Sequence, residues 1–312
     1  MEVVEVVEYT DCVCSTAWGT EPLLRRLDWR HGHHLSWRKV MGGLVGNAAT
    51  GRADWDRVRA AEPMRAYWKR VWRLTGMPYP NPMHVMLQST DPAGRAVKAA
   101  ERQGQDVAHA VLRRFREQIF VFGFGPQTPD EFEAATLGAP SLDQARWRAD
   151  QSLPEVDAAY QADWRETREP NDYVRHLKHD SPMNGELKHS EGHDRYALPT
   201  LIFRGPGGEH TVAGWVDYED YEAALEAALP GATADPRPDP TPAQAFERWG
   251  MLTDKELAFL CGEGARPPAG VVIHDWGDGL VYFSAAEARA RGMEAKSKIA
   301  PARGNIGADH WV

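Results

Sequence analysis

Residues 11–22 read DCVCSTAWGTEP and place Cys14 at the boundary between an expected strand and an expected helix. The preceding residues, Val3 to Thr10, alternate valine with glutamate and tyrosine, which is typical of a β-strand. The stretch from Ser15 to Leu27 has the leucine spacing of a helix, and Pro22 is expected to kink it. A cysteine in this position lies at a helix N-terminus.

Strand signals return directly after this helix. Residues 33–46, HHLSWRKVMGGLVG, alternate again and end in a Gly-Gly turn. The order strand, helix, strand predicts a βαβ unit with a right-handed crossover. We read His31, His33 and His34 as surface residues, because they come at the start of the second strand and active sites lie at strand C-termini.

The position of Cys14 predicts a reactive thiol. The first backbone N–H groups of a helix are unpaired and carry a partial positive charge, which favours thiolate over thiol. The alternative is a small buried residue at a strand end, because free cysteine also packs like a small hydrophobe. The position of Cys14 in the sequence does not by itself decide between a reactive thiol and a buried packing residue.

The order of several short motifs resembles the DsbA-like branch of the thioredoxin fold, and within it the cytoplasmic bacterial proteins called FrnE-like. The matching residues begin with Asp11, Cys14, Trp18, Gly19, Glu21 and Pro22, followed by Gly42, Gly43 and Leu44. Further matches are Thr75-Gly76-Met77-Pro78, the run 95–100, the run 113–121 and Leu198-Pro199-Thr200. The resemblance covers about residues 3 to 230. It implies an α/β thioredoxin-like fold with an all-helical insertion, and a cis-proline, Pro199, that faces Cys14.

This sequence departs from the family at its reactive centre. The second cysteine of the usual Cys-x-x-Cys pair falls on Ala17, so Cys14 lacks the thiol that resolves a mixed disulfide. Three outcomes stay open: Cys14 works with an external thiol, Cys12 acts as a strained resolving thiol, or the fold is kept for binding alone. We therefore expect no unaided insulin reduction or dithiol oxidation.

The resemblance also implies the other site residues. Cys14, and Cys12 beside it, are the candidate catalytic residues. The candidate substrate contacts are Ser15, Trp18, Gly42, Gly43, Leu198 and Pro199. No tightly bound cofactor is implied, although a thiol of the glutathione or mycothiol type would fit an enzyme with one cysteine. Glu21 is expected to pair with a cation or to be exposed.

A histidine-containing stretch comes directly before Pro199. It holds His176, His179, His189 and His193. His189 and His193 are spaced i, i+4, so a helix would place both on one face, where they are weak metal candidates. Because the stretch precedes Pro199, we expect it to lie at the rim of the Cys14 site, where a charged imidazole would lower the thiol pKa.

The sequence predicts the following domain organisation. Residues 1–50 and 196–230 form the thioredoxin-like domain, the latter holding a hairpin and a closing helix. Residues 51–195 form the helical insertion with the histidine-containing segment, and residues 231–242 are a proline-rich linker. Residues 243–312 form a small C-terminal module of helices and a hairpin, winged-helix-like in pattern. Cys261 is expected to be buried there.

Composition narrows the class of protein. Hydrophobic residues make up 42% of the 312 residues, which predicts a packed globular chain. A net charge of -9 disfavours nucleic acid as a partner, and no apolar run is long enough to span a membrane. The acidic N-terminus does not have the pattern of a signal peptide, and three cysteines disfavour a disulfide framework, so a cytoplasmic location is expected.

The expected function is thiol-dependent chemistry through Cys14 on a small molecule or a protein thiol, as an oxidoreductase, transferase or isomerase. The alternative is a non-catalytic thioredoxin-fold adaptor or ligand-binding protein. The sequence leaves open whether the chain is an enzyme and whether it forms a homodimer.

Overall fold

A computed structural model describes residues 2–178 and 183–293 of the chain. Its central sheet has the strand order β2-β1-β5-β6. β1 (Val4–Thr10) is parallel to β2 (Leu35–Met41), whereas β5 (Thr200–Gly205) is antiparallel to β1 and to β6 (Gly208–Ala213). The helix α1 (Ser15–His31) connects β1 to β2, which confirms the predicted βαβ unit. α1 runs four residues past the predicted end at Leu27 and keeps Pro22 inside it.

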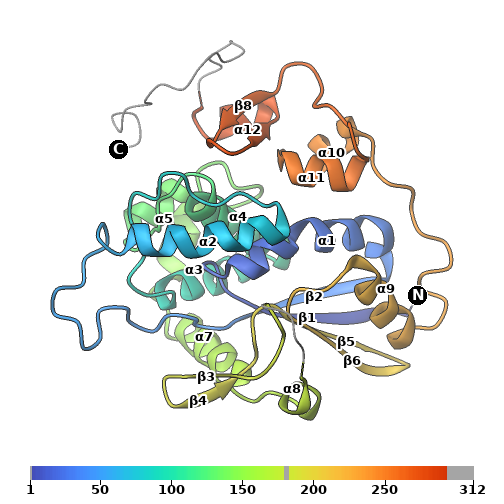
Figure 1. The fold of residues 1–312 in the computed structure, drawn as a ribbon, viewed down its shortest axis with the longest axis horizontal. Helices are drawn as coiled ribbons and strands as arrows, with labels where there is room; N and C mark the ends of the chain where they lie inside the picture. The colour runs from blue at the N-terminus through green and yellow to red at the C-terminus, as the bar shows by residue number, and fades with distance from the viewer. Residues whose placement is uncertain (1, 179–182, 294–312) are drawn as a thin grey trace.

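Helices cover both faces of this sheet (Figure 1). One face of β1 packs through Val4 and Val6 against leucines of α1 and against α9 (Tyr218–Ala228), the helix that follows β6. The other face of β1, through Val7 and Tyr9, packs against Val174 and Tyr196. β1 is therefore a central strand that is buried on both faces.

Seven helices separate β2 from β5 within the described residues. They are α2 (Ala61–Thr75), α3 (Asp91–Glu101), α4 (Gln105–Phe120), α5 (Pro129–Ala135), α6 (Gln144–Asp150), α7 (Pro154–Thr167) and α8 (Asp172–His176). They enclose the largest apolar cluster among the described residues, which includes Val111, Phe115 and Trp147. Trp18 of α1 enters this cluster and stacks on Phe120, so the helical layer is fixed to the thioredoxin-like sheet.

The expectation of an insertion that is helical throughout is wrong at its last part. Two short strands, β3 (Lys188–Ser190) and β4 (His193–Arg195), form a hairpin there. Its turn residues, Glu191 and Gly192, both have positive φ angles, 53° and 79°. A two-residue hairpin loop of the favoured twist requires positive φ at both central positions. Glu191 is an unusual residue at such a position, so the sequence pattern did not reveal the turn.

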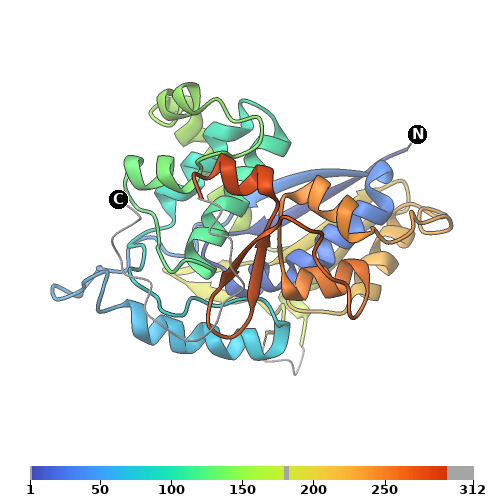
Figure 2. The ribbon, with the colours of Figure 1, turned by 90° about the horizontal axis from the view of Figure 1, so that it is seen from above.

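The C-terminal part forms a module above α1 (Figures 1 and 2). It contains α10 (Pro242–Trp249), β7 (Met251–Thr253), α11 (Asp254–Cys261), β8 (Val272–Asp275), β9 (Leu280–Phe283) and α12 (Ala285–Ala290). Its three strands have the order β7-β9-β8, and Met251 and Phe283 reach into the large cluster of the helical layer. The module is thus packed on the rest of the protein through a shared core.

The proline-rich segment before this module follows the outer side of α1. The indole of Trp29 donates a hydrogen bond to the Pro238 carbonyl (2.7 Å), and Arg26 pairs with Asp239 at 2.6 Å. The guanidinium of Arg237 stacks on the Trp29 ring, 3.5 Å from its centroid. These contacts hold the segment against the helix. No helix in the described ranges is long and apolar enough to cross a membrane.

Candidate functional site

Cys14 is the N-cap of α1. Its backbone is extended, and its sulfur accepts a hydrogen bond from the Ala17 N–H at 3.4 Å. The Cys14 carbonyl accepts the N–H of Trp18 at 2.9 Å, which begins the helical hydrogen bonding. The sulfur therefore takes the place that a serine or aspartate oxygen usually occupies at an N-cap.

The Leu198–Pro199 peptide bond lies opposite this helix end and is cis. The Cys14 thiol donates a hydrogen bond to the Leu198 carbonyl, with Sγ and O 3.2 Å apart. The position of this carbonyl follows from the sheet, because Thr200, the first residue of β5, pairs with Tyr9 of β1. The structure thus brings together three of the predicted site residues: Cys14, Leu198 and Pro199.

Burial decides the ionisation of Cys14. The side chain is 6% exposed, and this burial raises the thiol pKa to about 11. The Ala17 N–H and the Arg116 charge act in the opposite direction, whereas the Asp11 charge adds to the increase. The prediction of a Cys14 thiolate is therefore wrong, because the loss of hydration outweighs the effect of the helix terminus.

A second thiol is not brought to Cys14. Ala17 is fully buried in the cluster that contains Cys14 and Leu198. Cys12 is 1% exposed and belongs to the other cluster, the one inside the helical layer. Burial and the nearby Asp11 raise its pKa well above the usual value. The two cysteines thus face different parts of the core, which gives no support to Cys12 as a resolving thiol.

Gly42 and Gly43 follow β2 and border the same centre. A Cβ on Gly42 would lie 2.8 Å from Leu198 Cδ1, so a larger residue there would displace the Leu198 side chain beside Cys14. Gly43 has φ of 57°, and the N–H of the next residue, Leu44, donates to the Asp11 carboxylate at 2.8 Å. The turn at Gly42 and Gly43 thus keeps the C-terminal ends of β1 and β2 together beside Leu198.

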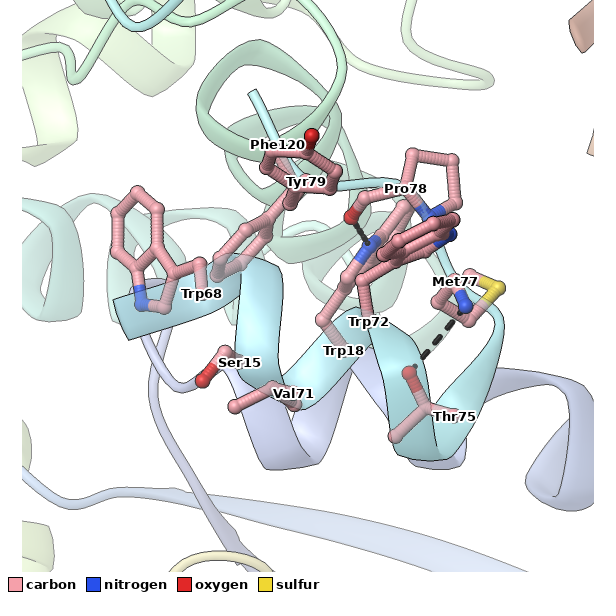
Figure 3. A pocket seen from close by; sticks show the side chains of 10 residues that line it. All are labelled: Ser15, Trp18, Trp68, Val71, Trp72, Thr75, Met77, Pro78, Tyr79 and Phe120. Carbon is pink, nitrogen blue, oxygen red and sulfur yellow. Dashed lines mark hydrogen bonds between the residues drawn. The ribbon is translucent and has the colours of Figure 1, made fainter. Parts of the chain in front are cut away.

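Ser15 and Trp18 lie on the side of α1 that faces α2. Figure 3 shows them with Trp68, Val71 and Phe120 around a hollow that is too small to admit a water molecule. The Trp18 indole donates to the Pro78 carbonyl at 2.8 Å and is 2% exposed. Trp18 therefore packs in the core, away from the Leu198 side of Cys14.

The β3–β4 hairpin separates the two metal candidates. His189 pairs with Asp194 across the hairpin, and His193 pairs with Ser190. Because neighbouring residues of a strand point to opposite faces, His189 and His193 lie on opposite faces and not on one helix face. His189 bonds to Asp194 at 3.1 Å, and His193 contacts the Trp164 ring. No cluster of three metal-ligating side chains occurs in the parts of the chain that the structure describes.

Other residues of this segment approach Cys14. Leu177 and Leu187 pack against the cluster that contains it, and the Thr16 hydroxyl lies 3.6 Å from the sulfur of Met183. The Arg195 guanidinium interacts electrostatically with Cys14. His176 is exposed, with Nδ1 bonded to the Asp172 carbonyl, and His179 lies outside the described residues. The segment thus borders the site through apolar residues and an arginine.

Arg116 of α4 is the residue that the sequence reasoning missed. It is 1% exposed and donates to the Thr10 hydroxyl, the Asp11 carbonyl and the Glu21 carboxylate. Burial opposes the ionisation of Glu21, but the charges of Arg116 and Arg113 outweigh it and lower the Glu21 pKa to about 2. Glu21 is therefore an ion-pair partner. The i, i+4 pair Arg113–Glu117 marks this helix in the sequence but does not reveal which face is buried.

Two further expectations need correction. His31 is fully buried at the end of α1 and bonds to Glu222 at 2.8 Å, so it is not a surface residue. Helix α1 continues to His31, which turns this side chain toward α9. Cys261 is partly exposed rather than buried, because it is the last residue of α11 and the helix ends at Gly262.

The comparisons with known proteins agree with this geometry. The sequence model described as Thioredoxin matches residues 8–171, which run from the second half of β1 through α7 and include Cys14. The chain belongs to the thioredoxin family. Among solved structures, it is similar to a putative protein disulfide isomerase from Nitrosomonas europaea, with a TM-score of 0.54 and 15% identity over 73% of this chain and 98% of the other. A probable DsbA oxidoreductase from Streptomyces coelicolor gives a TM-score of 0.50 and 17% identity, over 73% of this chain and 91% of that one. These structures share the DsbA-like fold.

The curated relatives of this thioredoxin-family chain are described as adapter proteins, whereas the two solved structures are described as a disulfide isomerase and an oxidoreductase. It is 26% identical to the ClpXP adapter protein SpxH of Shouchella clausii over 82% of this chain and 77% of that protein. The protein of the same name from Bacillus cereus is 24% identical over 82% of this chain and 79% of its own length. The similarity extends beyond the residues matched by the family model.

Proposed function

We propose that this protein is an adapter that binds a partner protein and delivers it to the ClpXP protease, with the thioredoxin fold serving as a binding scaffold. The observation that carries the proposal is the state of Cys14. Its thiol is buried, hydrogen-bonded to Leu198 and protonated at neutral pH. A protonated thiol is a poor nucleophile. The names of the SpxH relatives support the same function.

The absence of a resolving thiol adds to this argument. Ala17 occupies the position of the second cysteine, and Cys12 faces a separate part of the core. A dithiol oxidoreductase releases its partner by attack of the second thiol on the mixed disulfide. A chain that binds without redox cycling needs neither a thiolate nor a resolving cysteine. Adapter function also fits the cytoplasmic location that the sequence suggests.

A comparison of protein abundances in the source cells tests the adapter function. Partner proteins should accumulate when the gene for this chain is deleted, and the same proteins should accumulate when the protease is removed. Deleting both should add nothing further, since the two act in one route. A Cys14→Ser version should restore normal levels. Accumulation that does not depend on the protease, or failure of the Cys14→Ser version with a normal fold, would contradict the proposal.

A second candidate function is thiol chemistry through Cys14 alone. The arrangement of Cys14, the Ala17 N–H and the cis Leu198–Pro199 bond favours it, since the backbone N–H would stabilise a thiolate once the site opened. Cys14 would attack a disulfide of a small molecule or protein to form a mixed disulfide, and an external thiol of the glutathione or mycothiol type would release it. This assignment corresponds to the FrnE-like resemblance. The Cys14→Ser version separates the two candidates, because thiol chemistry would be lost in it.

A further inference from the structure

A second hollow lies between α1, β2, α4 and the C-terminal helices α10 and α12. It has a volume of about 300 Å³, and its lining shares no residue with the Cys14–Leu198 pair. This volume is at the lower end of the range for small-molecule sites. The walls come from the sheet region, the helical layer and the C-terminal module, so the hollow exists only when all three are packed together.

Buried ion pairs form much of its walls. Six cations belong to one connected network: Arg25, Lys39, Arg113, Arg114, Arg116 and Arg291. Five carboxylates connect them: Glu8, Glu21, Glu117, Glu256 and Glu287. None of these side chains is more than 14% exposed. The network is therefore shielded from water.

The network carries one more cation than carboxylates, counted over the residues that the structure describes. Burying an uncompensated charge costs several kcal/mol, so a buried network tends towards charge balance. His109, which lines the same hollow, adds no charge, because burial and the Lys39 charge lower its pKa to about 3. Asp106 also lines the hollow but is solvent-exposed, and the lining carboxylate of Asp28 is paired with Arg248, which lines the hollow as well. Water therefore screens the Asp106 carboxylate from the buried cations.

Arg25 shares its carboxylate partner with a second arginine. It contacts the Glu256 carboxylate at 2.9 Å, but Arg113 already binds both oxygens of that carboxylate at 3.0 Å. The second contact of Arg25 is with the carbonyl of Met251. The hydrogen bond to Met251 and the ion pair with Glu256 both use the same terminal nitrogen of Arg25. The guanidinium lies over the ring of Trp249, 5.4 Å from its centroid.

We propose that this hollow binds a small molecule through an oxyanion, a carboxylate or a phosphate group, held by the guanidinium of Arg25 beside Trp249. A planar guanidinium binds two oxygens of such a group at once. The bound anion supplies the negative charge that the network lacks. Trp249 and Trp37, which both line the hollow, offer aromatic surface to the rest of the ligand.

Anion titrations of the full chain test this proposal. Inorganic phosphate, acetate and benzoate are titrated separately at constant ionic strength, with chloride as the reference, and thermal unfolding and tryptophan fluorescence are recorded. A saturable rise in Tm is expected with at least one oxyanion, together with a change in the summed fluorescence of the twelve tryptophans, of which Trp37 and Trp249 line the hollow. Preference for benzoate over phosphate identifies a carboxylate ligand, and the reverse identifies a phosphate ligand.

Two arginine variants on α1, one inside the hollow and one outside it, test whether Arg25 binds the anion. Arg25→Gln should weaken the response at least tenfold, whereas Arg26→Gln, which removes a cation paired with Asp239 outside the hollow, should leave it unchanged. Because Arg25→Gln leaves five cations and five carboxylates, it should fold without any anion. If it does not fold, Arg25→Lys keeps the charge without the planar guanidinium and should bind more weakly. An equal response in the Arg25 variants and the wild type, or a response no larger than that to chloride, would overturn the proposal.

Discussion

The thiol of Cys14 donates a hydrogen bond to the backbone carbonyl of Leu198 across 184 residues of sequence, with Sγ and O 3.2 Å apart. This contact requires the proton on sulfur. It joins the start of α1 to the cis-proline loop and leaves Cys14 6% exposed. The same pair of residues that would hold a substrate peptide in a redox enzyme thus holds the thiol in its neutral form.

Alkylation should therefore be slow at Cys14. With a thiol pKa of about 11, the rate with iodoacetamide should be more than 100-fold below that of an unfolded cysteine at pH 7, whose pKa is about 8.5. Because the pKa is raised, the rate should increase about tenfold per pH unit until the pH approaches 11. Mass spectrometry of the tryptic peptide measures this, with the protein in denaturant as the control. Rapid modification of native Cys14 at pH 7 would contradict the burial seen here.

Replacement of Ala17 with cysteine should restore a dithiol centre. The Ala17 N–H lies 3.4 Å from the Cys14 sulfur, so the new side chain begins within reach of it. We expect the Ala17→Cys variant to form a disulfide on mild oxidation and to reduce insulin in the presence of dithiothreitol, which the wild type should not do. The loss of two mass units and the turbidity assay report the two effects. Ala17→Ser is the matched control, and a variant that stays reduced would show that the helix end is too rigid to close the ring.

Arg195, rather than a histidine, should tune the Cys14 thiol from the hairpin segment. Its charge interacts with Cys14, whereas His189 and His193 lie exposed on opposite hairpin faces. Removing the cation in Arg195→Gln should raise the Cys14 pKa. Alkylation at pH 9 should then slow by about threefold for each half unit by which the pKa rises. His189→Gln and His193→Gln should leave the pH profile of alkylation unchanged. A slower reaction in the histidine variants, with no change in Arg195→Gln, would reverse this assignment.

Glu256 should be the most costly carboxylate to remove. It is fully buried and pairs with both Arg113 and Arg25, so Glu256→Gln leaves buried cations without compensation and should reduce the free energy of unfolding by about 3–5 kcal/mol. Burial opposes its ionisation, but Arg113 and Arg25 lower its pKa. Its contribution is therefore present above the unfolded pKa, about 4.3, and is lost as pH falls through the lower folded value.

Urea unfolding of the Glu256→Gln variant at pH 7 and pH 4 measures this contribution. Glu62→Gln is the control, because Glu62 forms an exposed pair with Arg65 on α2 and its replacement should leave the stability nearly unchanged. Equal effects of the two substitutions at pH 7 would mean that the network around Glu256 does not stabilise the fold.

Much of the fold follows from local sequence patterns. The alternation of residues 3–10, the leucine spacing after Ser15 and the hairpin signal around Pro206 predict β1, α1 and the β5–β6 hairpin. The hairpin β3–β4 was missed because its turn rests on Glu191 in a left-handed conformation, which no sequence pattern marks. The buried network was missed as well, since its members come from β1, α1, β2, α4 and the C-terminal module.

The sequence by itself determined that Cys14 lies at a helix N-terminus and that Ala17 replaces a second thiol, because both properties depend only on neighbouring residues. Tertiary structure alone decided the charge of Cys14. A helix terminus favours the thiolate by a local electrostatic effect. The loss of hydration depends on Tyr196 and Leu198, which directly precede β5, and on Ile202 within β5, and these residues reach Cys14 because β5 pairs with β1. Burial by distant residues outweighed the local effect, and the thiol that the sequence marks as reactive is held neutral.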